Sequence, residues 1–303
     1  MNKKIDGLIA APFTPFHQDG SLNLDMVKPL ALHLQKSGAS GAFVCGTTGE
    51  GVSMTSDERK QVAARWRQEL PAPLKVIVHV GDNSLGRAQD LARHAEQIGA
   101  DAIAAIAPNF FRPASVNDLV DWCAGIASAA PKTPFYYYHM PAMSGVNFAM
   151  ADFLPLAAAK IPSFGGIKFT HENLMDYAQC VVLAGDKYSI LFGRDEILLS
   201  ALALGAKGAV GSTYNYACPI YNRVIKAFES GDRSAAAAAQ MESINFIVAF
   251  CRQGGMAGGK AIMAMIGLDC GPVRAPIANL TPAQVATLKA DLEKIGFFKA
   301  VAC

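Results

Sequence analysis

The sequence predicts a parallel (β/α)8 barrel with a C-terminal helical extension. Two observations indicate this fold: short apolar runs alternate with longer segments of helical period, and this rhythm repeats eight times without a linker. The ends of successive runs lie roughly 20 to 35 residues apart, which is the length of a strand-plus-helix unit. Eight such units favour a barrel of about 225 residues over a doubly wound sheet.

The first four runs are each followed by a segment that can form a helix. We expect strands at residues 8–12, 41–45, 76–80 and 102–107, and helices that begin near residues 24, 56, 84 and 115. Asn23 is the expected N-cap of the first helix, and Gly38 is its expected end. Thr55 and Glu58 have the spacing of a capping box at the start of the second helix.

The second half of the chain keeps the same rhythm and then changes. Further strands are expected at residues 135–138, 164–169, 189–192 and 209–212. After residue 232 the pattern changes: residues 234–251 and 257–266 are apolar and helical, and Thr281-Pro282 is a typical start for a last helix that runs to about residue 294. We interpret residues 1–230 as the barrel and residues 231–303 as an extension packed on it, because about 70 residues without a linker would make a marginal separate domain.

Composition restricts the class of protein and its partners. Hydrophobic residues make up 51% of the 303 residues and charged residues only 17%, which is typical of a compact globular protein. The net charge is +2 and no basic run is present, so nucleic acid is not an expected partner. No stretch approaches the roughly 18 uninterrupted apolar residues of a membrane span. Asp6, Pro12 and Pro15 interrupt the N-terminal apolar stretch too early for a signal peptide.

The cysteines indicate a reducing compartment. Seven cysteines are spread widely along the chain, without a Cys-x-x-Cys pair. This pattern favours free thiols in a cytoplasmic protein over a disulfide framework or a zinc site. The histidines also lack the spacing of metal ligands, and His139 is interpreted as a structural residue. We therefore expect no bound metal.

The most informative residue is Lys168, which stands near the end of the apolar run 164–169. A strand of this kind is buried on both sides, where a solvated ammonium is out of place. Removal from water lowers the pKa of a lysine, which ordinarily lies near ~10.4, and the free amine can then attack a carbonyl carbon to form a Schiff base. The alternative is a lysine whose stem covers apolar surface while its head reaches water.

Reactive groups of a (β/α)8 barrel lie at the carboxyl ends of its strands, and two other predicted strand ends carry suitable residues. Thr47 and Thr48 can offer two hydroxyls and backbone N–H groups to an anion such as a carboxylate. Tyr138 can transfer protons beside an amine. Each also has a structural interpretation: threonine is common in turns, and a tyrosine in an apolar run is usually part of the core.

The strand ends taken together carry a more specific signal. In order, they read Gly46-Thr47-Thr48-Gly49-Glu50, Tyr138-His139-Met140-Pro141, Gly166-Ile167-Lys168, Gly193-Arg194-Asp195-Glu196 and Gly211-Ser212-Thr213-Tyr214-Asn215. This combination resembles the pyruvate-dependent class I aldolase superfamily and, within it, the N-acetylneuraminate lyase (sialic acid aldolase) family. The resemblance covers nearly the whole chain, including the helical tail.

The resemblance implies roles for particular residues. Lys168 matches the Schiff-base lysine, and Tyr138 matches the tyrosine that acts as acid and base at the substrate's hydroxyl and carboxylate. Thr47 and Thr48 match the pair that holds the pyruvyl carboxylate. The positions that match those binding the polyhydroxylated part of a sialic acid are Thr170, Gly193, Asp195, Glu196 and Ser212. The acidic pair among them can also serve a helix N-terminus, where negative charge is favourable.

Two departures separate the chain from dihydrodipicolinate synthases of the same superfamily. Those enzymes carry an arginine where this chain has Met143, and they use a tyrosine from a neighbouring subunit where this chain has Phe110 and Phe111. A phenylalanine cannot relay a proton, so the synthase activity is not expected. Arg194 stands inside the sugar motif at a variable position, and it leaves the preference for the acyl group open.

The implied reaction is the reversible cleavage of N-acetylneuraminate to pyruvate and N-acetylmannosamine. The resemblance also implies a homotetramer and no cofactor, since the protonated imine is the electron sink. Two alternatives remain at this stage. A 2-keto-3-deoxy sugar acid aldolase would share Lys168 and Tyr138 and differ at the sugar contacts. A non-catalytic ligand-binding member of the superfamily would not need either residue.

Overall fold

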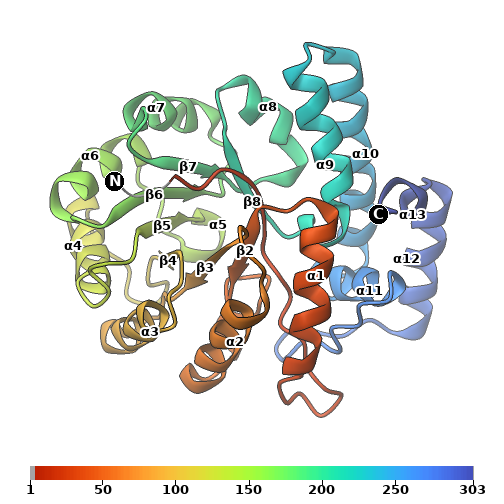
Figure 1. Ribbon diagram of the computed structural model, residues 1–303, viewed down its shortest axis with the longest axis horizontal. Helices are drawn as coiled ribbons and strands as arrows, with labels where there is room; N and C mark the ends of the chain where they lie inside the picture. The colour runs from red at the N-terminus through yellow and green to blue at the C-terminus, as the bar shows by residue number, and fades with distance from the viewer. Residues whose placement is uncertain (1–3, 303) are drawn as a thin grey trace.

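The computed structural model describes residues 4–302 and contains a closed barrel of eight parallel strands (Figure 1). The strands are β1 (Gly7–Ala10), β2 (Gly41–Val44), β3 (Lys75–His79), β4 (Ala102–Ile106), β5 (Phe135–His139), β6 (Phe164–Phe169), β7 (Ser189–Phe192) and β8 (Gly208–Gly211). Each strand pairs with the next along the chain, and β8 pairs back with β1. The predicted (β/α)8 barrel is confirmed, whereas the predictions about residues 1–3 and Cys303 lie outside the described residues.

Helices cover the outside of the barrel. They are α1 (Val27–Ser37), α2 (Ser56–Glu69), α3 (Leu85–Gln97), α4 (Val116–Ala127), α5 (Pro141–Ser144), α6 (Met150–Lys160), α7 (Leu174–Ala184), α8 (Leu198–Ala203) and α9 (Tyr214–Glu229). Short 3-10 turns are η1 (Leu24–Met26), η2 (Gly51–Ser53) and η3 (Asp195–Ile197). The C-terminal helices are α10 (Arg233–Arg252), α11 (Met256–Met265), α12 (Pro282–Lys294) and α13 (Phe297–Ala300).

The predicted helix-end signals are mostly present. The Thr55 hydroxyl accepts from the backbone N–H of Glu58, whose carboxylate accepts in return from the N–H of Thr55 at 2.8 Å. Gly38 ends α1 in the left-handed conformation, with φ of 85°. The prediction for Asn23 is wrong in detail: this residue precedes η1, and its side chain makes no capping hydrogen bond. The start of α1 is therefore stabilised by continuation from the 3-10 turn.

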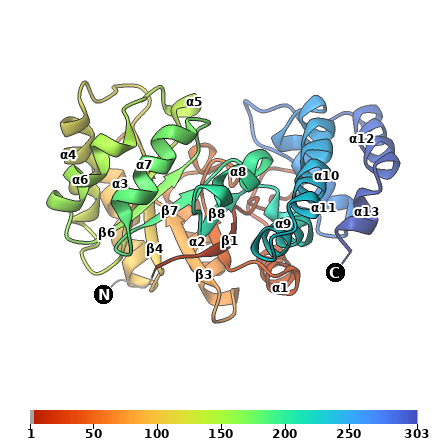
Figure 2. The same ribbon diagram turned by 90° about the horizontal axis from the view of Figure 1, so that it is seen from above.

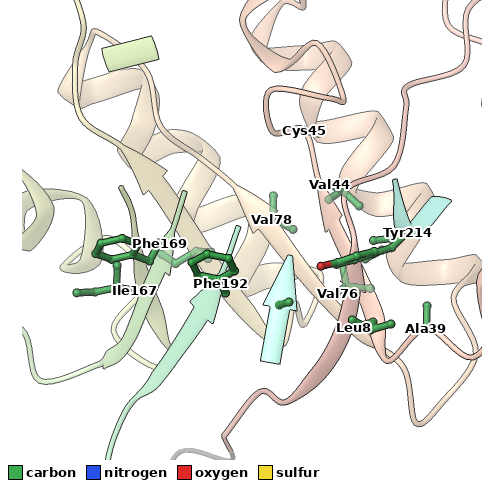
Figure 3. Close-up of a cluster of buried hydrophobic side chains, with 14 of the residues drawn as sticks. Leu8, Ala39, Val44, Cys45, Val76, Val78, Ile167, Phe169, Phe192 and Tyr214 are labelled. Carbon is green, nitrogen blue, oxygen red and sulfur yellow. The ribbon is translucent and has the colours of Figure 1, made fainter. Parts of the chain in front are cut away.

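Side chains alternate between two layers of the barrel wall. Ile167 and Phe169 point outward and pack in the large cluster between strands and helices, part of which is drawn in Figure 3. Lys168, between them, points inward together with Tyr138, its partner in the β5–β6 register. The inner layer also contains Phe43 from β2. The alternation expected of a strand thus places one lysine among inner aromatic side chains.

The C-terminal helices α10–α13 gather beside α9 at one side of the barrel, opposite α4 and α6 (Figures 1 and 2). Helix α10 has the length and composition of a helix that could cross a membrane. It nevertheless buries the polar side chains of Gln240 and Ser243. The Gln240 amide donates to the backbone carbonyl of Asp195 at 3.1 Å, and its oxygen accepts from the N–H of Leu199. Helix α10 therefore packs directly behind the loop that follows β7.

Candidate active site

All the sequence-predicted site residues line one pocket at the carboxyl ends of the strands. The pocket has a volume of about 280 Å³. The predicted residues that line it are Thr47, Thr48, Tyr138, Lys168, Thr170, Gly193, Asp195, Glu196 and Ser212. They come from the ends of five strands, β2, β5, β6, β7 and β8, so the closure of the barrel brings them together. Carboxyl ends of barrel strands are where (β/α)8 enzymes place their reactive groups.

Lys168 is almost completely buried and faces the pocket. Its side chain is inside the barrel and only 4% of the residue is exposed, so the snorkelling interpretation does not apply. The Nζ atom lies 3.9 Å from the ring centroid of Phe43 and 3.9 Å from that of Tyr138. Burial lowers the pKa of Lys168 to about 7, and the negative charge of Asp195 acts in the opposite direction. A lysine with this pKa is a nucleophile at neutral pH.

Tyr138 reaches the same space from the neighbouring strand. Its hydroxyl lies 3.3 Å from Oγ1 of Thr47 and contacts the sulfur of Met140 at 2.9 Å. Burial raises the pKa of Tyr138 to about 12, and the hydrogen bond with Thr47 opposes this shift. The phenol therefore keeps its proton at neutral pH. It can donate that proton to an anion while it accepts another from a substrate hydroxyl.

The loop after β2 brings Thr47 and Thr48 to the pocket. Its backbone is folded back on itself: the N–H of Glu50 donates to the carbonyl of Thr47 at 3.0 Å, and the N–H of Gly51 donates to that of Gly46. The Thr14 hydroxyl closes the loop further by donating to the carbonyl of Gly49 at 2.6 Å. Two threonine hydroxyls at one edge of the pocket can bind a carboxylate near Tyr138.

Asp195 is a buried carboxylate with a defined orientation. It accepts from the N–H of Thr213 at 3.0 Å and from the Thr213 hydroxyl at 2.6 Å. Burial raises the pKa of Asp195 to about 6, although both hydrogen bonds from Thr213 lower it. A Cβ atom on Gly211 would overlap the Asp195 carboxylate, and one on Gly193 would overlap the Thr170 hydroxyl. Glycine at these two positions lets polar side chains line the pocket closely.

Arg194 and its neighbouring carboxylates form a charged cluster beside the residues that the resemblance predicts to bind a sugar. The Arg194 guanidinium contacts Glu172 from the β6–α7 loop and lies 3.5 Å from Glu196. Glu172 also lies 3.0 Å from Nδ1 of His171. Arg194 thus links the loops that follow β6 and β7. The Glu196 carboxylate is held beside a positive charge at the pocket wall.

Sequence reasoning missed the wall that the C-terminal helices contribute. Ile247, Phe250 and Cys251 of α10 and Met256 of α11 line the pocket, as does Met140 of the β5–α5 connection. No local pattern distinguishes these residues from ordinary core positions of apolar helices. Their role arises only from the packing of α10 and α11 against the barrel mouth.

Other residues singled out in the sequence lie outside the pocket lining. His139 is buried on the outer face of β5, 5.1 Å between ring centroids from Phe169, and burial lowers its pKa to about 3. Phe110 and Phe111 are 78% and 84% exposed. Within residues 4–302, no group of three metal-ligating side chains is placed to hold a metal ion, and no disulfide joins the cysteines.

The fold and the pocket define a (β/α)8-barrel lyase of the class I aldolase type. Comparison with known proteins gives the family. The chain belongs to the dihydrodipicolinate synthetase family, whose sequence profile matches residues 4–295. The N-acetylneuraminate lyase of Rattus norvegicus is 42% identical over 300 residues, which cover 97% of this chain and 94% of the relative.

Solved structures give the same result. The N-acetylneuraminate lyase of Proteus mirabilis superposes with a TM-score of 0.94 at 42% identity, covering 97% of this chain and 100% of that one. The N-acetylneuraminate lyase (sialic acid aldolase) of Aliivibrio salmonicida has a TM-score of 0.94 at 43% identity, covering 97% and 98%. The predicted membership of the aldolase superfamily is confirmed.

Proposed function

We propose that this protein is a lyase that cleaves N-acetylneuraminate reversibly to pyruvate and N-acetylmannosamine. One observation carries the proposal: Lys168 is buried at the end of β6, and burial lowers its pKa to about 7. About half of the molecules then carry the free amine at neutral pH, against about one in a few thousand for an ordinary lysine. The full-length similarity to N-acetylneuraminate lyases supports the choice of substrate.

The reaction proceeds through a covalent imine. Nζ of Lys168 attacks the C2 ketone of the open-chain sugar acid, and loss of water gives a protonated imine. The iminium accepts the electron pair of the C3–C4 bond as that bond breaks, so N-acetylmannosamine leaves and an enamine remains on Lys168. Protonation of the enamine at C3 and addition of water at the imine carbon then release pyruvate and the free amine.

Tyr138 accepts the proton of the substrate's C4 hydroxyl. Because the pKa of Tyr138 is raised to about 12, the phenol is protonated when the substrate binds. Its oxygen accepts the C4 proton while its own proton passes to the substrate carboxylate, which Thr47 and Thr48 hold nearby. The 3.3 Å separation between Tyr138 Oη and Thr47 Oγ1 supports this arrangement. General acid–base catalysis of this kind contributes about 10²- to 10⁴-fold.

The opposite side of the pocket receives the polyhydroxylated part of the sugar. Asp195 and Glu196 offer carboxylate oxygens to hydroxyl donors, while Thr170 and Ser212 offer hydroxyls. Gly193 leaves room for the Thr170 side chain to lie against the backbone at this side of the pocket. Arg194 restrains Glu196 and so takes part in shaping this side.

The alternative of a 2-keto-3-deoxy sugar acid aldolase is not favoured, because the full-length relatives at about 42% identity are N-acetylneuraminate lyases. A non-catalytic member would have no reason to bury an amine of lowered pKa beside a tyrosine. The dihydrodipicolinate synthase activity is not favoured either. Met143 is exposed where the synthases have an arginine, and Phe110 cannot relay a proton.

We further propose a cytoplasmic homotetramer that acts in carbohydrate metabolism, with residues 1–230 as the barrel and 231–303 as its extension. Exposed apolar side chains support contacts between subunits. Met175, Val182 and Leu183 are exposed on α7, and Phe110 and Phe111 are exposed after β4. Sedimentation of the purified protein measures the oligomeric state, and a monomer would contradict this part of the proposal.

A trapping experiment tests the function. The protein is incubated with pyruvate and cyanoborohydride, and the adduct is located by peptide mass; we expect it on Lys168. In parallel, pyruvate and N-acetylmannosamine are measured after addition of N-acetylneuraminate. An adduct without cleavage of N-acetylneuraminate would favour the keto-sugar aldolase. Absence of any adduct on Lys168 would refute the imine mechanism.

A further inference from the structure

The loop between β2 and η2 adopts an unusual backbone conformation. Cys45 and Glu50 have positive φ angles of 58° and 53°, and they are the non-glycine residues for which the described chain shows this. Non-glycine residues in the left-handed region are disfavoured unless the surroundings hold them there. Thr47 and Thr48 lie between these two residues. The position of both hydroxyls therefore depends on whatever fixes the two ends of the loop.

The end at Glu50 is fixed by the C-terminal extension. The Glu50 side chain is 0% exposed, and its Oε1 lies 2.8 Å from Nζ of Lys260 on α11. The other oxygen accepts from the backbone N–H of Arg274 at 2.7 Å. Lys260 is itself held by donation to the carbonyl of Pro272 at 2.6 Å. A buried charge from the barrel thus meets its partners more than 200 residues later in the chain.

Lys260 is also enclosed by an aromatic ring and a second cation. Its Nζ lies 4.4 Å from the ring centroid of Phe16, and the Arg274 guanidinium lies 4.2 Å from the same centroid. The residue is buried, so the ion pair is shielded from bulk water. If the ammonium is removed, the Glu50 carboxylate keeps the N–H of Arg274 but loses its ion-pair partner. A buried carboxylate without that partner moves toward solvent or takes up a proton.

A backbone hydrogen bond couples the position of Glu50 to that of Thr47. The N–H of Glu50 donates to the carbonyl of Thr47, and the Thr47 hydroxyl lies 3.3 Å from the Tyr138 hydroxyl. A shift of the left-handed turn therefore displaces Thr47 relative to Tyr138. The amine of Lys168 belongs to β6 and does not depend on this loop.

We propose that the Glu50–Lys260 ion pair positions the Thr47–Thr48 loop for binding of the substrate carboxylate, so that Lys260 is a positioning residue supplied by the C-terminal extension. This inference rests on the proposed function, in which the two threonines hold the pyruvyl carboxylate. It assigns the extension a part in substrate binding. The inference also makes a distinction between two steps. Loss of Lys260 weakens binding of the substrate carboxylate, whereas the attack of Lys168 on the ketone is not impaired.

The test compares two ketones that differ in the carboxylate. Wild type and Lys260→Met are incubated with increasing pyruvate or acetone, and the imine on Lys168 is reduced with cyanoborohydride and measured by peptide mass. We expect the pyruvate concentration for half-maximal trapping to rise about tenfold or more in the variant, because small displacements of positioning groups have effects of this size. Trapping of acetone should stay within about twofold of wild type, since it does not use the loop.

The double variant Lys260→Met/Glu50→Gln provides a matched control. It removes the buried charge together with its partner, while the glutamine oxygen can still accept from the N–H of Arg274. We expect it to recover most of the lost pyruvate affinity. Should the single variant fail to fold, Glu50→Gln alone is expected to weaken pyruvate trapping to a smaller extent and leave acetone trapping unchanged.

Three results would overturn the inference. Unchanged half-maximal pyruvate trapping in both Lys260→Met and Glu50→Gln would show that the ion pair does not position the loop. Equal losses with pyruvate and acetone would show a general effect on the fold. Failure of the wild-type protein to form any pyruvate adduct would overturn the proposed function and this inference together, and that outcome is recognised before any variant is compared.

Discussion

Replacing Lys168 by methionine is expected to end catalysis and to stabilise the fold. Methionine has a similar length and suits the aromatic surroundings of Phe43 and Tyr138, whereas the lysine must give up much of its positive charge on folding. The pKa of Lys168 falls from 10.5 in water to about 7 in the folded protein. The unfolded chain therefore binds more protons than the folded one at neutral pH, which destabilises the folded state.

The size of this effect follows from the two pKa values. At pH 7 the protonation difference of Lys168 costs the folded wild type about 4 kcal/mol, and at pH 9 it costs about 2 kcal/mol. The cost is fully present below pH 7 and disappears as the pH rises through 10.5, the value of an ordinary lysine. The advantage of the methionine variant is therefore expected to shrink by about 2 kcal/mol between pH 7 and pH 9.

Urea unfolding of both proteins at pH 7 and pH 9, at one protein concentration, measures this advantage. The pH dependence is the decisive quantity, because changes in packing at position 168 contribute equally at both pH values. The reasoning is refuted if the difference in unfolding free energy between Lys168→Met and wild type does not change with pH. A variant that is stabilised only at pH 9 would contradict the sign of the pKa shift.

Three further predictions concern other parts of the site and its support. Tyr138→Phe should lower kcat for cleavage by about 10²- to 10⁴-fold, while mass spectrometry still detects the reduced pyruvate adduct; unchanged kcat would contradict the proton-transfer role. Gly193→Ala places a Cβ against the Thr170 hydroxyl, and it should lower kcat/KM for N-acetylneuraminate on the order of 100-fold while pyruvate trapping is retained. Arg274→Gln should lower stability above pH 4.5, because Arg274 is the main cause, with Thr55, of the fall in the pKa of Glu58 from 4.5 to about 2. The difference from wild type should fade between pH 4.5 and pH 2. Urea unfolding from pH 6 to pH 3 would contradict this if the difference stayed constant.

The barrel could be predicted because its strands are buried on both faces. A run such as residues 164–169 is apolar in both its inward and outward positions, so it stands out from the helices around it. The ends of elements were less accurate: the first strand was expected at residues 8–12 and is observed at Gly7–Ala10. Helices α5 and α13 were not predicted, since four-residue helices depend on tertiary packing more than on local preference.

The site was partly predictable for a different reason. Lys168 could be predicted because a charged side chain is unexpected in an apolar run. The other site residues were predicted from the resemblance of the strand-end motifs to the aldolase superfamily. Phe250 and Met256, which form part of the pocket wall, could not be predicted, because apolar residues are ordinary in apolar helices. The Glu50–Lys260 pair was also hidden. Its two members are more than 200 residues apart, and either one alone resembles a solvated surface charge.

The surroundings of Lys168 meet two opposing requirements of imine chemistry. The amine must be neutral to attack the ketone, yet the imine must be protonated to accept the electrons of the breaking bond. Burial favours the neutral amine, whereas Asp195 and the ring faces of Phe43 and Tyr138 favour a cation at the same place. Burial without these groups would lower the pKa further and destabilise the iminium. A pKa of about 7 for Lys168 therefore balances two needs: a neutral amine that can attack the ketone, and an environment that stabilises the positively charged iminium formed from it.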